Sequence, residues 1–311
     1  MKTPQGEHMS DNPKHVPVLL QIAIRMLNVR RGGVYMDATL GLAGHASEIA
    51  RQLGPQGTLI GFDRDPQAME LAQQNLAALA AELGPEMPKV VLHDVEYSQM
   101  ADLLAGIKLD GLLADFGVSS LQFDEAHRGF SFQADAALDM RMNPRTGPTA
   151  AQVVNQSGEK ELANLIYEFG EERRSRRIAR AIVRSRPVTT TAQLAKVVAG
   201  AAGAMKGERI HPATRTFQAL RIYVNAELDE IDALLKAAPG LLKPGGRLVV
   251  ISFHSLEDRL AIDALREGGR QGIFEVLTRK PVTASEEETD RNPRSRSAKL
   301  RAAERTDKRL E

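Results

Sequence analysis

Cysteine and tryptophan are absent from this chain, and only 4% of its 311 residues are aromatic. The lack of cysteine excludes disulfides and cysteine-ligated zinc, and it suits a reducing compartment such as the cytoplasm. No apolar run approaches the roughly 20 residues of a membrane helix, and the polar start of the chain has no signal-peptide core. Basic and acidic residues are nearly balanced, since 41 of the first and 40 of the second give a net charge of +1. Any nucleic-acid footprint must therefore be local.

The stretch from residue 33 to residue 53 has the pattern of a buried strand, a glycine turn and a helix. The strand ends at Asp37, and the turn carries Gly41 and Gly44. Such a turn lets a ligand meet bare backbone, and the helix start offers unpaired N–H groups. A second predicted strand ends at Asp63, 22 residues after Gly41. An acid at about that distance reaches a ribose hydroxyl in nucleotide-binding folds.

The glycine pattern favours S-adenosylmethionine over a dinucleotide. The chain has G-x-x-G with an acid upstream, whereas a pyrophosphate requires the fuller G-x-G-x-x-G cradle. A ligand with one adenosine and no phosphate does not need that cradle, and its α-amino group would suit the acid at Asp37. The alternative is an ordinary α/β turn in which Asp63 only caps a helix.

Two further strands are predicted over residues 89–94 and 109–115, and they end at Asp94 and Asp115. The first two strands end in acids in the same way. In an open parallel sheet the carboxyl ends of the strands lie at one edge, where ligands bind. We therefore expect these acids to surround a ligand site.

Beyond residue 129 the alternation of strand and helix stops. Apolar residues recur at i, i+3, i+4 and i+7 between residues 162 and 198, which predicts helices. The small, glycine-rich stretch 199–207 is predicted to be a loop. Residues 173–186 hold seven arginines and no acid. A solvated helix face is the common alternative, but this concentration favours contact with phosphates.

The rest of the chain returns to the sheet. One helix is predicted over residues 217–235 and a fifth strand over 246–253. Two weaker strand candidates, 273–277 and 297–303, are joined by the charged linker 286–296 instead of a helix. Strands connected in that way pair antiparallel at a sheet edge. The predicted fold class is α/β, with a Rossmann-like seven-stranded methyltransferase sheet and an inserted all-helical domain.

The length also predicts about two domains. Residues 1–12 form a polar tail that we expect to be disordered. The methyltransferase domain is predicted to comprise residues 13–134 and 211–311. The inserted helical domain, residues 135–210, is predicted to recognise the substrate.

Five longer motifs are more specific than the glycine turn. They are DFGVSS (115–120), RGFSF (128–132), LDMRM (138–142), HPATRTFQ (211–218) and ISFHSLEDR (251–259). Together they resemble the RsmH (MraW) family, whose members methylate N4 of a cytidine in 16S rRNA with S-adenosylmethionine. The resemblance runs from residue 15 to about residue 305. It implies S-adenosylmethionine as cofactor, the decoding region of the small ribosomal subunit as partner, a cytoplasmic location, no metal and no membrane. A homodimer is compatible with it.

The resemblance also implies site residues. Ala43 stands where the family usually has glycine, and its methyl group disfavours a positive φ. His254 follows the fifth strand at the same sheet edge as Asp115, and these two are the candidate catalytic residues. The implied cofactor positions are Ala43, Gly44, His45, Asp63, Tyr97, Asp115 and Gln122. The candidate substrate contacts are Ser119, Ser120, Arg141, Arg176, Arg177, Arg180, Arg215 and Phe253.

Methyl transfer from a sulfonium is an in-line displacement that needs its reactants collinear and dry. Cytosine N4 is a poor nucleophile because its lone pair is delocalised into the ring, and acceptors on its N–H bonds would localise that pair. Asp115 could be such an acceptor or could serve the cofactor, and we expect a cofactor or shared role. His254 and Phe253 could line the cytosine pocket, or His254 could be a satisfied turn residue.

The sequence leaves two other functions open. A nicotinamide-dependent oxidoreductase would need the phosphate cradle that the glycine turn lacks. A non-catalytic RNA-binding assembly factor could keep the fold, but the intact acids Asp63 and Asp115 argue against it. A metal enzyme is disfavoured because the seven histidines show no H-E-x-x-H or similar ligand spacing.

Overall fold

The computed structural model describes residues 17–203 and 210–309, apart from the side chain of Ser120. The tail expected at residues 1–12 lies outside the described residues. Seven strands of the described residues form one sheet, and the prediction of seven strands is confirmed. The strands are β1 (Val34–Asp37), β2 (Thr58–Asp63), β3 (Lys89–Asp94), β4 (Leu109–Asp115), β5 (Leu242–Ser252), β6 (Phe274–Val276) and β7 (Lys299–Arg305).

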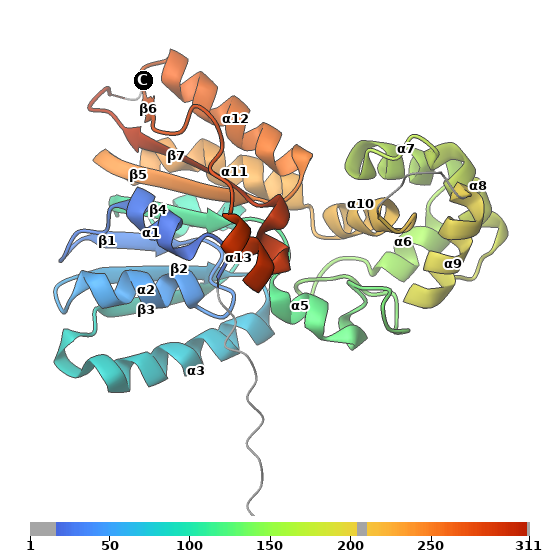
Figure 1. The fold of residues 1–311 in the computed structure, drawn as a ribbon, viewed down its shortest axis with the longest axis horizontal. Coiled ribbons are helices and arrows are strands. Elements are labelled where there is room, and N and C mark those ends of the chain that lie inside the picture. Colours follow the sequence, from blue (N-terminus) through green and yellow to red (C-terminus); the bar gives the residue numbers. More distant parts are fainter. Residues whose placement is uncertain (1–16, 204–209, 310–311) are drawn as a thin grey trace, which may run out of the picture.

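The strand order is β3-β2-β1-β4-β5-β7-β6 (Figure 1). Neighbouring strands are parallel from β3 to β5. β7 is antiparallel to both of its neighbours, as predicted for the closing pair. The order reverses direction between β1 and β4, and in open α/β sheets ligands bind outside the carboxyl ends of the strands at this point.

Helices cover both faces of the sheet because its strands are apolar on both. Along β1, Tyr35 packs in the core of one face and Met36 in the core of the other. The first core includes α1 (Leu20–Leu27), α2 (Gly44–Leu53) and α3 (Pro66–Leu83). The second includes α4 (Met100–Leu103), α11 (Glu227–Leu241) and α12 (Ser255–Arg270).

A separate group of helices stands beside the sheet (Figure 1). We call it the helical unit, and its members share a third hydrophobic core. Gly170 shows how closely two of its helices approach, since a Cβ there would lie 2.5 Å from the Arg215 carbonyl oxygen. The members are α6 (Ala150–Gln156), α7 (Glu159–Gly170), α8 (Ser175–Arg184), α9 (Thr191–Ala202) and α10 (Thr214–Val224).

The helical unit differs in two ways from what the sequence predicted. Its core includes Phe217 and Leu220 of α10, so its packing continues beyond residue 210, where the insertion was expected to end. The stretch from residue 199 was expected to be a loop, but its first residues belong to α9, which ends at Ala202 with Gly203 as its C-cap. Residues 204–209 of that stretch lie outside the described residues.

The single helix predicted over residues 217–235 is wrong. The chain breaks at Asn225 and Ala226, and Ala226 adopts a left-handed conformation with φ 47°. At this break, the side chain of Asn225 accepts the backbone N–H of Met142 and donates to the backbone carbonyl of Met140. α11 then runs past Pro239, which has no N–H to donate to the carbonyl four residues earlier, and ends two residues later.

The linker predicted over residues 286–296 contains a short helix, α13 (Glu286–Arg291). Ser285 caps it by accepting the backbone N–H of Glu288, and three glutamates occupy its first turn. That Ser-x-x-Glu pattern is a helix-start signal that the charge-based interpretation overlooked. None of the described helices combines the length and the hydropathy that a bilayer crossing requires.

Candidate active site

A cavity of about 390 Å³ opens at the carboxyl ends of β1, β2, β4 and β5. Its volume lies in the range of small-molecule sites. Residues that follow these four strands line it, and α10 and α11 close one side. Nine of the predicted site residues line the cavity: Gly44, His45, Asp63, Tyr97, Asp115, Ser119, Gln122, Phe253 and His254.

Asp63 ends β2 with both carboxylate oxygens facing backbone donors. Oδ2 accepts the N–H of Gly41 at 2.8 Å, and Oδ1 accepts that of Asp65 at 2.9 Å. Burial raises the pKa of Asp63 to about 6, against the opposing effect of these two hydrogen bonds. Each oxygen keeps a second lone pair. The carboxylate can therefore accept two ribose hydroxyls while it holds the glycine turn in place.

The raised pKa predicts how cofactor affinity depends on pH. Ribose hydroxyls donate to the ionised carboxylate, so the ligand-bound state favours loss of the proton. We expect the affinity for S-adenosylhomocysteine to fall about tenfold for each pH unit below about 6. Calorimetric titrations from pH 5 to pH 8 measure this. Asp63→Asn, which cannot ionise, should make the profile shallower below pH 6, where Asp37, with its pKa of about 7, still contributes. An equally steep profile in that variant would assign the effect to another group.

Ala43 lies in the glycine turn, where its side chain was expected to disfavour a positive φ. Ala43 nevertheless adopts φ 62°, and its N–H donates to the Leu40 carbonyl at 2.7 Å. Ala43 is fully buried and does not line the cavity. Next to it, a Cβ on Gly44 would lie 2.2 Å from Pro17. Gly44 is thus required by contact with the N-terminal segment, whatever ligand binds.

Asp115 ends β4 beside the switch in strand order. Its Oδ2 lies 4.0 Å from Nδ1 of His45, and its Oδ1 accepts no hydrogen bond within the part of the chain that the structure describes. Burial raises the pKa of Asp115 well above its usual value, and the charges of Asp37 and Glu257 add to the effect. A buried acceptor without a donor fits a site completed by a ligand.

One other acid, Asp37, and one phenol, Tyr97, lie at this edge of the sheet. Burial raises the pKa of Asp37 to about 7, and the nearby charge of Asp63 contributes. Burial also raises the pKa of the Tyr97 hydroxyl well above its usual value, so the phenol is neutral. A cavity surrounded by buried carboxyls favours a cationic ligand. These carboxyls therefore fit S-adenosylmethionine, which carries a sulfonium, an α-amino group and a ribose.

The side chain of Gln122 is occupied by protein contacts. Its amide oxygen accepts the N–H of Ser119, and its amide nitrogen donates to Oδ2 of Asp65 at 2.7 Å. Ser119 is the N-cap of α5 (Ser120–Asp124), and the two residues form a capping box. The assignment of Gln122 to the cofactor stays a prediction. In the structure, the hydrogen bonds of Gln122 fix the loop that precedes α5. The side chain of Ser120 is not described.

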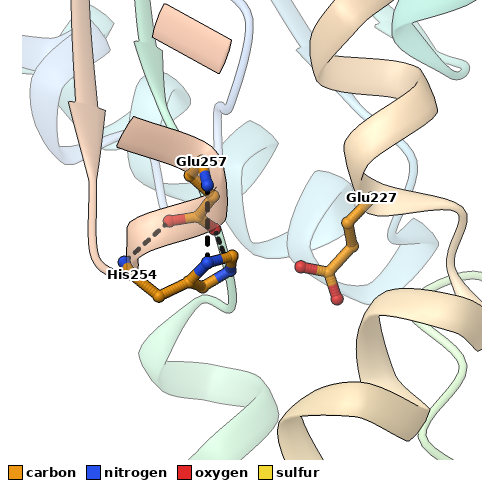
Figure 2. Close-up of side chains that lie close together, drawn as sticks. All are labelled: Glu227, His254 and Glu257. Carbon is orange, nitrogen blue, oxygen red and sulfur yellow. Dashed lines mark hydrogen bonds and ion pairs between the residues drawn. The ribbon is translucent and has the colours of Figure 1, made fainter. Parts of the chain in front are cut away.

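His254 caps α12 and belongs to a buried polar cluster with Glu227 and Glu257 (Figure 2). Its Nε2 lies 3.0 Å from Oε1 of Glu257, and its Nδ1 accepts the backbone N–H of Glu257 at 3.4 Å. Burial acts to raise the pKa of Glu257, but the hydrogen bond from His254 and the charges of His254 and Arg221 outweigh it and lower that pKa. Both ring nitrogens face Glu257, so the geometry suits His254 as a support for the pocket wall.

The three residues drawn in Figure 2 place one ligand atom each within 4.8 Å of one another, a spacing compatible with a metal ion. Arg221 already holds Glu227, however, with Nε and Nη2 at 2.8 and 2.9 Å from its two carboxylate oxygens. A guanidinium bound in this way supplies the positive charge that a metal would otherwise bring. We therefore interpret the cluster as an ion-pair network.

Sequence reasoning missed Arg221 and Glu227, which both line the cavity. They sit six residues apart across the break between α10 and α11, so they do not share a helix face. The signal that could have found them is an arginine and a glutamate within a stretch predicted to be one amphipathic helix. Phe123, Met142 and Arg294 also line the cavity and were not predicted.

The predicted arginine contacts lie elsewhere. Within the described residues, Arg141 pairs with Asp139 through two hydrogen bonds of 2.8 Å, and Arg215 lies 4.0 Å from Glu172. Arg176 and Arg177, both on α8, donate to Asn164 and to the Ala202 carbonyl. None of these four lines the cavity.

Not all of the arginine run is available to a partner. Arg174 binds Glu172, and Arg186 donates to the carbonyl oxygens of Val154 and Ser157. These two brace the helical unit. Arg176, Arg177 and Arg180 remain exposed on α8. Within the part of the chain that the structure describes, Arg180 forms a surface ion pair with Glu159 at 3.3 Å, which contributes little and is easily displaced.

Comparison with known proteins gives a consistent result. The model of the family described as the MraW methylase family matches residues 12–306. Three similar proteins each carry the name Ribosomal RNA small subunit methyltransferase H. That of Acidobacterium capsulatum is 79% identical over 295 residues, which cover 95% of this chain and 99% of that protein. That of Koribacter versatilis is 58% identical and covers 97% of each chain, and that of a Cyanothece species is 49% identical and covers 94% and 95%.

Proposed function

Because the chain belongs to the MraW methylase family, we propose that it methylates N4 of a cytidine in the decoding region of 16S rRNA. S-adenosylmethionine is its methyl donor, as predicted. The observation that carries the proposal is the acid-lined cavity at the strand switch, where Asp115 presents an acceptor without a donor. The relatives named for the small ribosomal subunit support RNA as the substrate. The cytoplasmic location and a homodimer stay predictions.

The cofactor would be held by residues on β1, β2 and the loops that follow. Asp63 accepts the ribose hydroxyls, and Tyr97 lines the cavity together with it. Asp37 does not line the cavity and supplies its negative charge for the α-amino group from the buried end of β1. When bound, S-adenosylmethionine supplies an electrophilic methyl group on a sulfonium. The carboxyls around the cavity would stabilise that cation.

Asp115 stands where the cofactor and substrate parts of the cavity meet. Its ionised carboxylate accepts an N–H of the cytosine amine, which localises the nitrogen lone pair and stabilises the positive charge that develops on N4. Phe253 and His254 line the substrate side, with His254 supported by Glu257. The target base must be single-stranded or flipped to reach this depth.

A methyl-transfer assay on purified small ribosomal subunits tests the proposal. With labelled S-adenosylmethionine, mass spectrometry of nucleosides from digested 16S rRNA should reveal N4-methylcytidine. Methylation of another atom would overturn the N4 assignment. Tight subunit binding without any transfer would favour the assembly-factor alternative. The same nucleoside should be lost from the rRNA of cells that lack the protein and restored by the parent gene.

We further propose that exposed arginines of α8 contact rRNA phosphates. Reversing Arg176, Arg177 and Arg180 to glutamate should abolish subunit binding at moderate salt, because like charges then face the RNA backbone. Cofactor affinity should not change, since these residues do not line the cavity. Filter binding across a salt series measures the effect, and the parent's log–log salt slope should exceed the variant's by about 2–3.

A matched reversal controls for net charge. Arg31, Arg51 and Arg266 are exposed arginines outside the helical unit, each in a surface ion pair. Their reversal to glutamate changes the net charge equally but should leave subunit binding close to that of the parent. Equal losses in both triple variants would reduce the α8 arginines to a solvated face.

A further inference from the structure

The chain passes between the sheet and the helical unit at two places, and both are tied to the residues that follow Asp63. The first crossing contains segment 140–142, which precedes α6, and the second is Asn225, which follows α10. Arg64 and Asp65 lie directly after Asp63 at the end of β2. Hydrogen bonds connect these elements in one network, which we call the joint.

Arg128 forms the first half of the joint. Its Nη1 donates to Oδ2 of Asp65 at 2.7 Å, and its Nη2 donates to the carbonyl oxygens of Arg141 and Met142 at 3.0 and 2.8 Å. Asp65 is fully buried and Arg128 is 8% exposed. One guanidinium thus spans from the cofactor loop to the first crossing. The planar fork of donors on arginine makes this possible, whereas a lysine ammonium cannot reach both groups at once.

Asn225 forms the second half. Its side chain accepts the N–H of Met142 at 2.7 Å and donates to the carbonyl of Met140 at 2.8 Å. Its own carbonyl accepts from Nη1 of Arg64 at 2.6 Å. Asn225 therefore ties the two crossings to each other and to the cofactor loop. Between these anchors Met140 holds φ 63°, a conformation that persists only when its surroundings enforce it.

The joint also extends to the cavity at two points. Asp63 Oδ1 accepts the N–H of Asp65, and Met142 is among the residues that line the cavity. A fully satisfied buried polar network is rigid and specifies one arrangement. The structure therefore connects the candidate ribose acceptor to the wall that faces the substrate through few, short and buried contacts.

We propose that Arg128 and Asn225 are positioning residues that fix the helical unit, and the RNA held on it, relative to the methyl donor. This inference rests on the proposed function. Transfer requires the attacking nitrogen, the methyl carbon and the sulfur in line, and a misplacement of about 1 Å costs about 10²-fold in rate. Loosening the joint should reduce the rate of the methyl-transfer step and leave cofactor binding intact.

Arg128→Lys and Asn225→Asp test the proposal. The lysine keeps a positive charge beside Asp65 but releases the carbonyls of segment 140–142. The aspartate keeps an acceptor for Met142 but places an anionic oxygen against the Met140 carbonyl. Each variant should lower the single-turnover rate about 10–100-fold at saturating RNA and cofactor, with S-adenosylhomocysteine affinity within twofold of the parent. Arg51→Lys, in a surface pair with Glu82, is the control and should retain the parent rate.

A second measurement does not depend on catalysis. Because the chain has no cysteine, Glu70→Cys on α3 and Lys160→Cys on α7 provide two unique sites for spin labels, both exposed. Pulsed electron–electron resonance should show a narrow distance distribution in the parent and a broad one when Arg128→Lys or Asn225→Asp is added. Thermal unfolding of each variant confirms that the parts remain folded.

The two measurements distinguish failure of this proposal from failure of the proposed function. Parent-like rates and parent-like distance distributions in both variants would overturn the proposal, as would a change in KM for RNA with an unchanged kcat. A rate loss explained by weaker cofactor binding would also overturn it. If the parent transfers no methyl group to small subunits, the proposed function fails, and the distance distributions still decide whether the joint fixes the helical unit.

Discussion

Asp115→Asn is expected to lower the single-turnover rate of methyl transfer by about 10²–10³-fold, the usual effect of removing one preorganised electrostatic group. Asparagine keeps the shape of the side chain and one acceptor oxygen but loses the negative charge. The transferring methyl group is cationic and the attacking amine becomes so. Asp115 carries a buried oxygen with no hydrogen-bond donor among the described residues, where such a charge is weakly screened. Rapid-quench measurement at saturating RNA and cofactor isolates this step.

The pH dependence gives the same variant a second signature. Burial raises the pKa of Asp115 well above its usual value, so its carboxyl tends to keep its proton as the pH rises. A protonated carboxyl has no negative charge with which to stabilise the cation that develops on the amine. The parent rate should therefore rise with pH as Asp115 ionises and then level off. Asp115→Asn should lack this rise because its amide does not titrate.

Asp110→Asn, at the opposite end of the same strand, is a matched control. Asp110 accepts the N–H of Val34 and pairs with Lys243, away from the cavity. Its replacement should lower stability and leave the single-turnover rate of the folded protein near that of the parent. If Asp115→Asn keeps a rate within a few-fold of the parent, the catalytic role is wrong and Asp115 is a cofactor ligand only.

The acids at the strand ends on the candidate cofactor side of the cavity could be predicted from local sequence. Each of β1 to β4 is a short apolar run that ends in an acid, and the parallel arrangement brings those ends to one edge. The glycine turn needed only its own glycines and the distance to Asp63. Such signals depend on neighbours in the chain, so they survive without knowledge of the tertiary structure.

The cavity wall that we propose to face the substrate could not be predicted in the same way. The ion pair between Arg221 and Glu227 exists because the helix breaks at Ala226, and the contacts that accompany that break join Asn225 to residues 83 and 85 positions earlier. No local pattern records such a partner. The arginine run shows the same limit, because packing decides that Arg186 binds carbonyls while Arg180 stays exposed.

The largest effect on cofactor binding is expected from Asp63→Ala. Truncating a charged hydrogen-bond partner costs roughly 2–4 kcal/mol, or about 30- to 1,000-fold in affinity. Two losses combine here. The ribose hydroxyls lose their acceptor, and the N–H groups of Gly41 and Asp65 lose the carboxylate that shapes the turn. Calorimetric titration with S-adenosylhomocysteine at pH 7.5 measures the loss.

Two comparisons separate the ribose contact from the support of the turn. Asp63→Asn keeps one acceptor oxygen for a backbone N–H, so its affinity should fall between those of the parent and Asp63→Ala. Asp94→Asn at the end of the adjacent strand β3 removes an acid that pairs with Arg145 outside the cavity, and it should bind like the parent. Parent-like affinity in Asp63→Ala would refute the ribose assignment. A loss in Asp63→Ala larger than that in Asp115→Asn, together with a smaller rate effect at saturating cofactor, would place binding at the end of β2 and catalysis at the end of β4.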